Sequence, residues 1–572
     1  MTGSTQRWTR PARAVGLALV GALAVSLTAC SGWSLDVPTS GPIQQGERLV
    51  GGEEGQFIRV IARPPAEGMS PAQIVQGFLD ASASFDGNHA VARQYLTPAA
   101  SAEWDSRAGV LVYDGVLGLS ATTTAAITAR GVLSGSIARD GHYVVEQPGR
   151  ELVAEFDLVE VDGQWRLDRV PSGLILSRAD VDRAFRTYDL YFYDPDFSRL
   201  LPDTRILPIL GPGMATTLMT RLLAGPSDWL SPAVRSAIPE GTTLSIASVP
   251  IEAGVARVDL SPGVRALAAG PLSVLAAQIT ATLAQVPEVS SVQLSAGGTR
   301  LVIPGLPTVL RVDSELVTGA RAAPPGTAYL LDDAGIARLT AEGVQPVSVR
   351  GTVPRLRSLA VYGDAARLAG IDGRGRLWLR ADGDFEVIPV GVVSSVEFDR
   401  SGTLWAVTRR GRVLVVGPDR AVSRVTVADL PTGSRIGRIS LAPDGVRLAV
   451  VADVDGGSTL LIGRITRGVD ALVTVSAFTR AEQQLTTVLD VGWEGDRSLV
   501  VLGTDGARAV QAVSVSLPRG ELRLLGGPAS PESVAAGPGV PILVGTADGV
   551  LVQSVFGLWR ETVAGREPVY AG

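Results

Sequence analysis

The chain has 572 residues, with 51 basic and 57 acidic side chains and a formal net charge of -6. One hydrophobic core rarely extends over this length, so we expect several domains. Every basic residue is an arginine, which excludes lysine Schiff bases and phosphate loops that end in Gly-Lys-Ser/Thr. The acidic balance, with no clustered basic patch, argues against nucleic-acid binding.

Cysteine and histidine are too scarce for most metal or redox chemistry. Cysteine occurs once, at Cys30, and histidine twice, at His89 and His142. These counts exclude intrachain disulfides and zinc sites built from Cys and His, and we expect no metal and no cofactor. His89 and His142 are interpreted as capping or strand-surface residues, with a catalytic role as the less favoured alternative.

The N-terminus has the features of an export signal. Arginines precede an apolar run over residues 14–27, which is shorter than the roughly 20 residues that a membrane-spanning helix needs. The run ends in four residues that resemble the lipobox of bacterial lipoproteins: Leu27, Thr28, Ala29 and Cys30.

This resemblance implies that residues 1–29 are a lipoprotein signal peptide and that Cys30 becomes the mature N-terminus, carrying S-diacylglycerol and N-palmitoyl groups. Such lipid chains would hold the protein in the cell membrane with its body on the extracytoplasmic face. The alternative is an ordinary signal peptide that is cut after Ala29. Residues 30–55 contain the cysteine and a stretch rich in Gly, Ser and Pro, which predicts a flexible tether.

Residues 56–188 are predicted to form an α+β domain. Ser70 is a candidate N-cap with Pro71 at the first helical position, and a second short helix is expected after a cap at Asn88. The apolar face of the first helix comprises Ile74, Val75, Phe78 and Leu79. Strand-like runs follow at residues 131–137, 142–145, 152–161 and 164–170. The order of helices and strands resembles the cone-shaped fold of nuclear-transport-factor-like domains.

Residues 189–306 resemble the GerMN domain, an α+β fold. The matching elements are an apolar strand at 190–193, a Leu-x-x-Gly-Pro turn at 222–226, an Ile-Pro-x-Gly-Thr turn at 238–242, a strand at 255–261, a helix at 271–287 and a strand at 289–294. In the strand at 255–261, alternation places Ala256, Val258 and Leu260 on one face. Asp259, Thr282 and Arg257 could form a site, but Asp259 beside a Ser-Pro corner is better interpreted as a hydrogen-bond acceptor of that turn.

Residues 307–572 repeat paired short strands around a tight turn, as at 396–407, 439–451 and 489–501. The unit recurs every 35 to 50 residues or so, which is the size of one four-stranded propeller blade. Leu404, Leu448, Leu499 and Leu543 occupy equivalent places. We predict an all-β propeller of five to seven blades, with a pair of β-sandwiches as the alternative.

Two kinds of residue in the propeller segment are candidates for a site. Asp372, Asp399, Asp444 and Asp490 could line the mouth of a central funnel, although a hydrogen bond within a turn or at a blade edge is the favoured role of each. Tryptophans could mark a partner surface but more commonly pack between blades; they are Trp378, Trp405, Trp493 and Trp559.

In this order the lipobox, the α+β domain, the GerMN-like domain and the propeller resemble the LpqB family of actinobacterial lipoproteins. The resemblance implies a membrane-anchored, non-enzymatic protein with no catalytic residues. It also implies that the protein binds the extracellular domain of an MtrB-type sensor histidine kinase and modulates MtrA-type two-component signalling, which is linked to cell-wall homeostasis and division. The alternative is a receptor for cell-wall fragments, or a carboxylate-dependent enzyme, that uses the propeller funnel.

Overall fold

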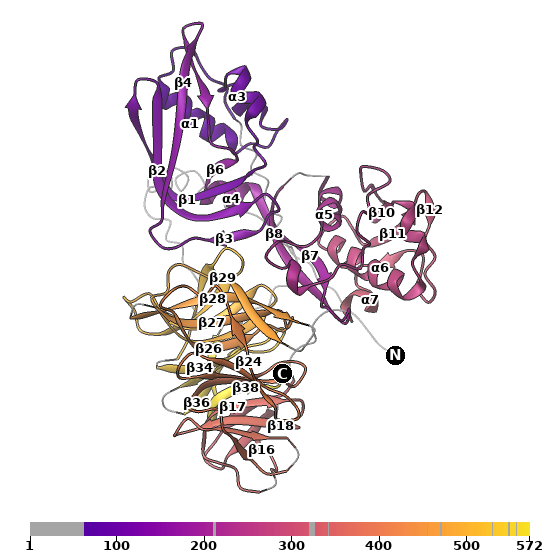
Figure 1. Ribbon diagram of the computed structural model, residues 1–572, viewed down its shortest axis with the longest axis vertical. Coiled ribbons are helices and arrows are strands. Elements are labelled where there is room, and N and C mark those ends of the chain that lie inside the picture. Colours follow the sequence, from indigo (N-terminus) through magenta and orange to yellow (C-terminus); the bar gives the residue numbers. More distant parts are fainter. Residues whose placement is uncertain are drawn as a thin grey trace, which may run out of the picture. The chain divides into compact units, whose positions relative to one another are not determined.

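A computed structural model describes residues 62–572, apart from residues 210–212, 320–325, 341–342, 350, 382, 455, 469–471, 529, 547–548 and 556–557 (Figure 1). Leu27, Thr28, Ala29, Cys30 and the tether lie outside the described residues. All described residues fall within one compact unit. Across these residues, no helix combines the length and apolar character needed to cross a bilayer.

The first helix, α1 (Pro71–Ser82), begins where the sequence predicts. The Ser70 hydroxyl accepts a hydrogen bond from the Gln73 amide, and the Gln73 side chain accepts one from the Ser70 amide at 2.8 Å, so a capping box closes the end. The predicted cap at Asn88 is wrong. Asn88 and His89 both have left-handed backbones, with φ of 57° and 60°, and His89 takes the N-cap position of α2 (Ala90–Arg93) without a side-chain cap.

The first domain is α+β, as predicted. Its sheet runs in the order β3-β2-β1-β6, and β4 pairs with both β2 and β5. The strands are β1 (Gly109–Thr123), β2 (Ala126–Ala138), β3 (Tyr143–Val145), β4 (Glu151–Val161), β5 (Gln164–Arg169) and β6 (Leu174–Ser177). The buried face of α1, which comprises Ile74, Val75, Phe78 and Leu79, shares one core with the inward residues of these strands. Helices α3 (Pro98–Glu103) and α4 (Arg178–Ala184) complete the domain.

The second domain is also α+β. It opens with a hairpin of β7 (Phe185–Tyr193) and β8 (Leu200–Pro208), so its first strand begins before residue 189. Strand β10 (Val255–Leu260) pairs in parallel with β11 (Ser291–Ala296), and helix α6 (Ala269–Leu283) connects them. Ala256, Val258 and Leu260 are fully buried, which confirms the predicted alternation. The remaining elements are α5 (Met214–Leu223), β9 (Ile251–Glu252), β12 (Thr299–Arg300), β13 (Leu310–Arg311) and α7 (Glu315–Thr318).

The third domain is all-β, and its first strand begins at Ala328. Within the described part of the chain, it contains six blades of four strands, five of which pair strands that follow one another in sequence. The first blade combines β14 (Ala328–Leu331), β15 (Ile336–Thr340) and β16 (Gly343–Pro346) with the C-terminal β38 (Arg566–Tyr570). Because β38 pairs with β14, the two ends of the propeller segment close the ring.

The other five blades are continuous in sequence. They are β17 (Leu356–Tyr362), β18 (Arg367–Asp372), β19 (Leu377–Arg380) and β20 (Glu386–Ile388); β21 (Val393–Phe398), β22 (Leu404–Thr408), β23 (Val413–Val416) and β24 (Val422–Arg424); β26 (Arg435–Leu441), β27 (Arg447–Val454), β28 (Gly457–Arg467) and β29 (Val473–Arg480); β30 (Thr487–Gly495), β31 (Ser498–Thr504), β32 (Gln511–Ser516) and β33 (Glu521–Gly526); and β34 (Pro531–Ala535), β35 (Leu543–Thr546), β36 (Val550–Val555) and β37 (Leu558–Ala564).

The repeated turns and leucines behave as the sequence predicts. Gly402 and Gly445 adopt φ of 78° and 74° in the turns between the first two strands of their blades. The equivalent leucines are all buried in the second strand of a blade: Leu404, Leu448, Leu499 and Leu543.

Candidate functional site

The propeller contains a central channel bounded by the inner strand of each blade. The inner strands β38, β17, β21, β26, β30 and β34 surround a cavity of about 160 Å³. A wider cavity of about 600 Å³ lies at the hairpin turns at one end of the ring. Both cavities are lined by Glu397, Phe398, Ser440 and Tyr570. We call the region around these four residues the throat, and we call the wider cavity the mouth.

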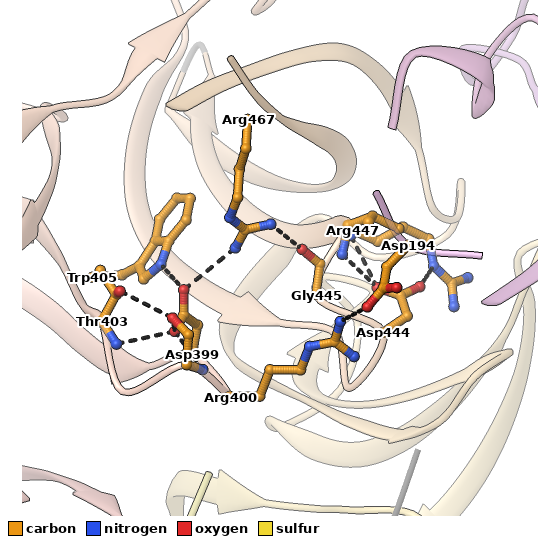
Figure 2. Close-up of polar contacts among 11 residues, drawn as sticks. Asp194, Asp399, Arg400, Thr403, Trp405, Asp444, Gly445, Arg447 and Arg467 are labelled. Carbon is orange, nitrogen blue, oxygen red and sulfur yellow. Dashed lines mark hydrogen bonds and ion pairs between the residues drawn. The ribbon is translucent and has the colours of Figure 1, made fainter. Parts of the chain in front are cut away.

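Asp399 is a structural residue of the turn between β21 and β22 (Figure 2). One carboxylate oxygen accepts hydrogen bonds from the Ser401 amide at 2.9 Å, the Ser401 hydroxyl at 2.5 Å and the Thr403 amide at 3.0 Å. The other accepts from the indole N–H of Trp405 at 3.1 Å and from Arg467 at 3.3 Å. These bonds occupy both oxygens, which leaves the carboxylate little capacity to act as a base or a ligand.

Asp372 and Asp444 are held in the same way. Asp372 accepts from the backbone and side chain of Arg376 and from the indole of Trp378 at 3.0 Å. Burial opposes its ionisation, but these hydrogen bonds outweigh burial and hold the pKa of Asp372 below its ordinary value. Asp444 accepts from the Val446 amide at 2.9 Å and forms an ion pair with Arg447. The predicted turn role of Asp372, Asp399 and Asp444 is therefore what the structure shows.

Asp490 lies in the channel itself, on the inner strand β30. Its carboxylate forms an ion pair with Arg438 of β26 at 2.8 Å and accepts a hydrogen bond from the Val534 amide of β34 at 2.9 Å. It links three blades at the wall of the channel. Of the four predicted aspartates, Asp490 faces the central cavity and Asp399 lines the mouth.

Two channel carboxylates were not predicted from the sequence. Burial raises the pKa of Glu397 to about 8, because a hydrogen bond from the Leu441 amide only partly offsets the loss of water. Burial likewise raises the pKa of Glu567 to about 7, although the charge of Arg438 acts in the opposite direction. Among the described residues, the Glu567 side chain has no hydrogen-bond donor, and its backbone φ is 50°.

The tryptophans of the propeller serve its packing. Trp405 is fully buried and Trp493 is 3% exposed. The indole N–H groups donate to fixed acceptors, Trp493 to the Ser440 carbonyl at 3.0 Å and Trp559 to the Leu525 carbonyl at 2.6 Å. Trp493 also lines the mouth.

Both histidines pack against aromatic rings. His89 is buried between Phe85 and Trp104, and burial lowers its pKa. His142 stacks on Trp229 of the second domain with ring centroids 6.0 Å apart, and burial lowers its pKa as well. Within the described residues, no group of three His, Cys, Asp or Glu side chains could hold a metal ion.

The residues of the second domain that could have formed a site serve separate structural contacts. Asp259 accepts a hydrogen bond from the Gly298 amide at 3.1 Å, as expected of a turn acceptor. Thr282 accepts from the Tyr191 amide at 3.2 Å, and Arg257 forms an ion pair with Glu252.

Polar contacts join the three domains. Asp194, in the β7–β8 turn, forms an ion pair with Arg400 of the propeller at 2.6 Å (Figure 2). Burial opposes its ionisation, but hydrogen bonds from Ser198 and the charge of Arg400 hold the pKa of Asp194 below its ordinary value. The Gln483 side chain of the propeller donates to the carbonyl of Ser134 in the first domain at 2.8 Å. The mouth is lined by Arg199 of the second domain as well as by Arg400 of the propeller. The second domain therefore borders the mouth.

Comparisons with known proteins agree with this architecture. Family models match at residues 64–182 (Lipoprotein LpqB, N-terminal domain), 189–302 (Sporulation and spore germination) and 335–571 (Lipoprotein LpqB beta-propeller domain). Lipoprotein LpqB of Thermobifida fusca (strain YX) is 32% identical and covers 96% of this chain and 97% of the relative. Lipoprotein LpqB of Cutibacterium acnes (strain DSM 16379 / KPA171202) is 30% identical and covers 88% of this chain and 87% of the relative. The crystal structure of TolB from Acinetobacter baumannii covers 54% of this chain and 86% of its own, at 16% identity and a TM-score of 0.34. With relatives of this similarity along nearly its whole length, the chain belongs to the LpqB lipoprotein family.

Proposed function

We propose that this lipoprotein is a non-catalytic binding module on the extracytoplasmic face of the cell membrane. In this proposal, lipid groups on Cys30 anchor it, and its body binds the extracellular domain of an MtrB-type sensor histidine kinase. The binding modulates two-component signalling linked to cell-wall homeostasis and division. Membership of the LpqB family along the whole chain supports the proposal, and so does the structural use of the turn aspartates, whose oxygens are already engaged.

The observation that carries the proposal is a set of exposed apolar side chains on the sheet of the first domain. Valine or leucine side chains that are 37% to 89% exposed occur on β1, β2 and β4; they are Leu111, Val116, Val132, Val153, Val159 and Val161. We call this set the valine face. Exposed apolar side chains on neighbouring strands of one sheet commonly mark protein-binding surfaces. We therefore assign the valine face to the kinase domain.

Charge introduced at the valine face tests this assignment. Val132 and Val153 are 48% and 45% exposed, so Glu should be accommodated there without disturbing the core. An unpaired carboxylate at an interface loses its water, so we expect Val132→Glu and Val153→Glu each to weaken capture of the kinase domain about tenfold or more. Binding of the purified extracellular domain to the mature lipoprotein in vesicles measures this.

Val302→Glu is the matched control, because Val302 is 71% exposed but lies in the second domain. Kinase binding that is unchanged by both valine-face variants, or weakened equally by Val302→Glu, would refute the assignment of this surface.

The anchor is tested separately with Cys30→Ala. Confinement to a membrane raises the effective concentration of a partner, so a weak contact suffices for signalling. We expect the variant to be released from the membrane and to weaken kinase control while the folded domains keep their thermal stability. If the released variant restored full control of the kinase at native abundance, the role of the anchor would be contradicted.

A further inference from the structure

The wall of the central channel carries more negative than positive groups. The charged side chains that line its cavity are Glu397, Arg438, Asp490 and Glu567. Arg438 and Asp490 neutralise each other at 2.8 Å. Within the described channel wall, neither Glu397 nor Glu567 forms an ion pair, although the charge of Arg438 also acts on Glu567.

Buried carboxylates without a cation are costly, because the interior does not replace the water that they lose. Within the described part of the chain, Glu397 accepts from two donors, the Leu441 amide at 3.1 Å and the Ser440 hydroxyl at 3.5 Å. Among the described residues, nothing donates to Glu567, which comes from a different strand. The described channel wall thus holds three carboxylates and one guanidinium.

The throat also has the shape and the lining that suit an organic cation. It opens into the mouth of about 600 Å³, so a group that enters at Glu397 can leave the rest of its molecule in the mouth. Tyr570 lines the throat, and aromatic rings attract ammonium groups. The Phe398 ring, which also borders the throat, already lies 5.3 Å from the guanidinium of Arg367. A metal ion fits less well, since no three suitable ligands cluster among the described residues.

We propose that the throat binds the ammonium group of a small organic cation, which enters from the mouth and is held by the Glu397 carboxylate with Asp490 behind it. The rest of the ligand lies in the mouth, beside the rings of Trp493 and Tyr362. This inference goes beyond the proposed kinase binding and does not depend on it.

The proposal predicts that binding releases a proton. The charged groups around Glu397 are Asp399 on the adjoining turn, Arg438 on β26, Asp490 on β30 and Glu567 on β38. Since the pKa of Glu397 is about 8 without ligand, the carboxyl is mostly protonated at neutral pH and must ionise to pair with the cation. Affinity should therefore rise by up to about tenfold per pH unit between about pH 6 and pH 8.

Isothermal titration of the mature protein with n-butylammonium, in buffers of different ionisation enthalpy, measures both affinity and proton release. n-Butanol, which has the same chain without the charge, is the neutral comparison. Glu397→Gln matches the protonated side chain in shape and should therefore fold. We expect it to weaken n-butylammonium binding about tenfold or more and to reduce the proton release to the share that Glu567 contributes.

Asp419→Asn is the control for general electrostatics, because Asp419 is exposed and lines neither the throat nor the mouth. It should leave n-butylammonium binding nearly unchanged. Equal binding of n-butanol, full competition by sodium ions at the same ionic strength, or unchanged affinity in Glu397→Gln would each overturn the proposal. Kinase binding by the same variants is measured in parallel, so failure of one proposal is distinguishable from failure of the other.

Discussion

Asp399→Asn would replace the carboxylate that organises the β21–β22 turn with an amide of nearly the same shape. In the folded protein, one carboxylate oxygen accepts from the Ser401 and Thr403 amides, and the other accepts from Trp405 and Arg467. An amide offers only one acceptor oxygen. Whichever way the amide is oriented, its NH₂ group therefore faces two donors.

The expected cost follows from the burial of the partners. Trp405 is fully buried, so its indole N–H cannot turn to water if the amide group faces it. An unsatisfied buried donor costs about 1–3 kcal/mol, and a second lost hydrogen bond adds about 1 kcal/mol. We expect Asp399→Asn to lower the free energy of unfolding by about 2–4 kcal/mol, which corresponds to a fall in Tm of roughly 5–15 °C for the propeller.

Thermal unfolding of the mature protein, together with hydrogen exchange of residues 393–408, measures this effect. Asp419→Asn is the matched control, because Asp419 is exposed and its side chain accepts only from the Ala421 amide at 3.1 Å, which an amide oxygen can replace. If Asp399→Asn unfolded within about 1 °C of the unsubstituted protein, the turn would not depend on the hydrogen bonds to Asp399 and the reasoning would be refuted.

Three further outcomes follow from the structure. Ser70→Ala removes the capping box with Gln73 and should lower the free energy of unfolding by about 1 kcal/mol in chemical denaturation, whereas an unchanged midpoint would contradict the cap. Burial raises the pKa of Glu397 from its ordinary value of 4.5 to about 8, so the folded protein retains a proton that the unfolded chain has lost. The free energy of unfolding should therefore fall as pH rises from about 5 to about 9, by at most about 1.4 kcal/mol per pH unit. Glu397→Gln should reduce this dependence of stability on pH. Equal dependence in both proteins would contradict the raised pKa of Glu397. Gly402→Ala places a Cβ 2.9 Å from Tyr362 at a φ of 78°, so it should lower the free energy of unfolding of the propeller by about 1–3 kcal/mol in thermal unfolding. Gly433 has a similar φ but open space around its Cβ position, so Gly433→Ala should lower the free energy of unfolding by less.

Sequence patterns were sufficient for features that depend on neighbouring residues. The cap at Ser70, the alternation of Ala256 and Val258, and the hairpin turns at Gly402 and Gly445 all follow from local chemistry, and the structure confirms them. Asn88 failed as a cap because two successive residues adopt left-handed backbones, which the spacing of apolar residues does not report.

The channel could not be predicted in the same way. Glu397 stands between two buried residues on its strand and resembles any outward-facing position of a half-buried strand. Only closure of the ring turns that face towards the central channel. Glu567 belongs to none of the repeats that the sequence reveals, and its place in the channel depends on pairing between β38 and β14, which are more than two hundred residues apart.

That pairing has a consequence for biogenesis. Since β38 supplies the innermost strand of the first blade, the blades cannot form a sealed ring until the ribosome has synthesised the final segment. Until then β14 presents an unpaired edge, which is a template for aggregation. Nascent propellers of this kind should depend on holding chaperones up to the last stage of synthesis, and proteolytic trimming of residues 566–570 should reopen the ring and destroy one wall of the channel.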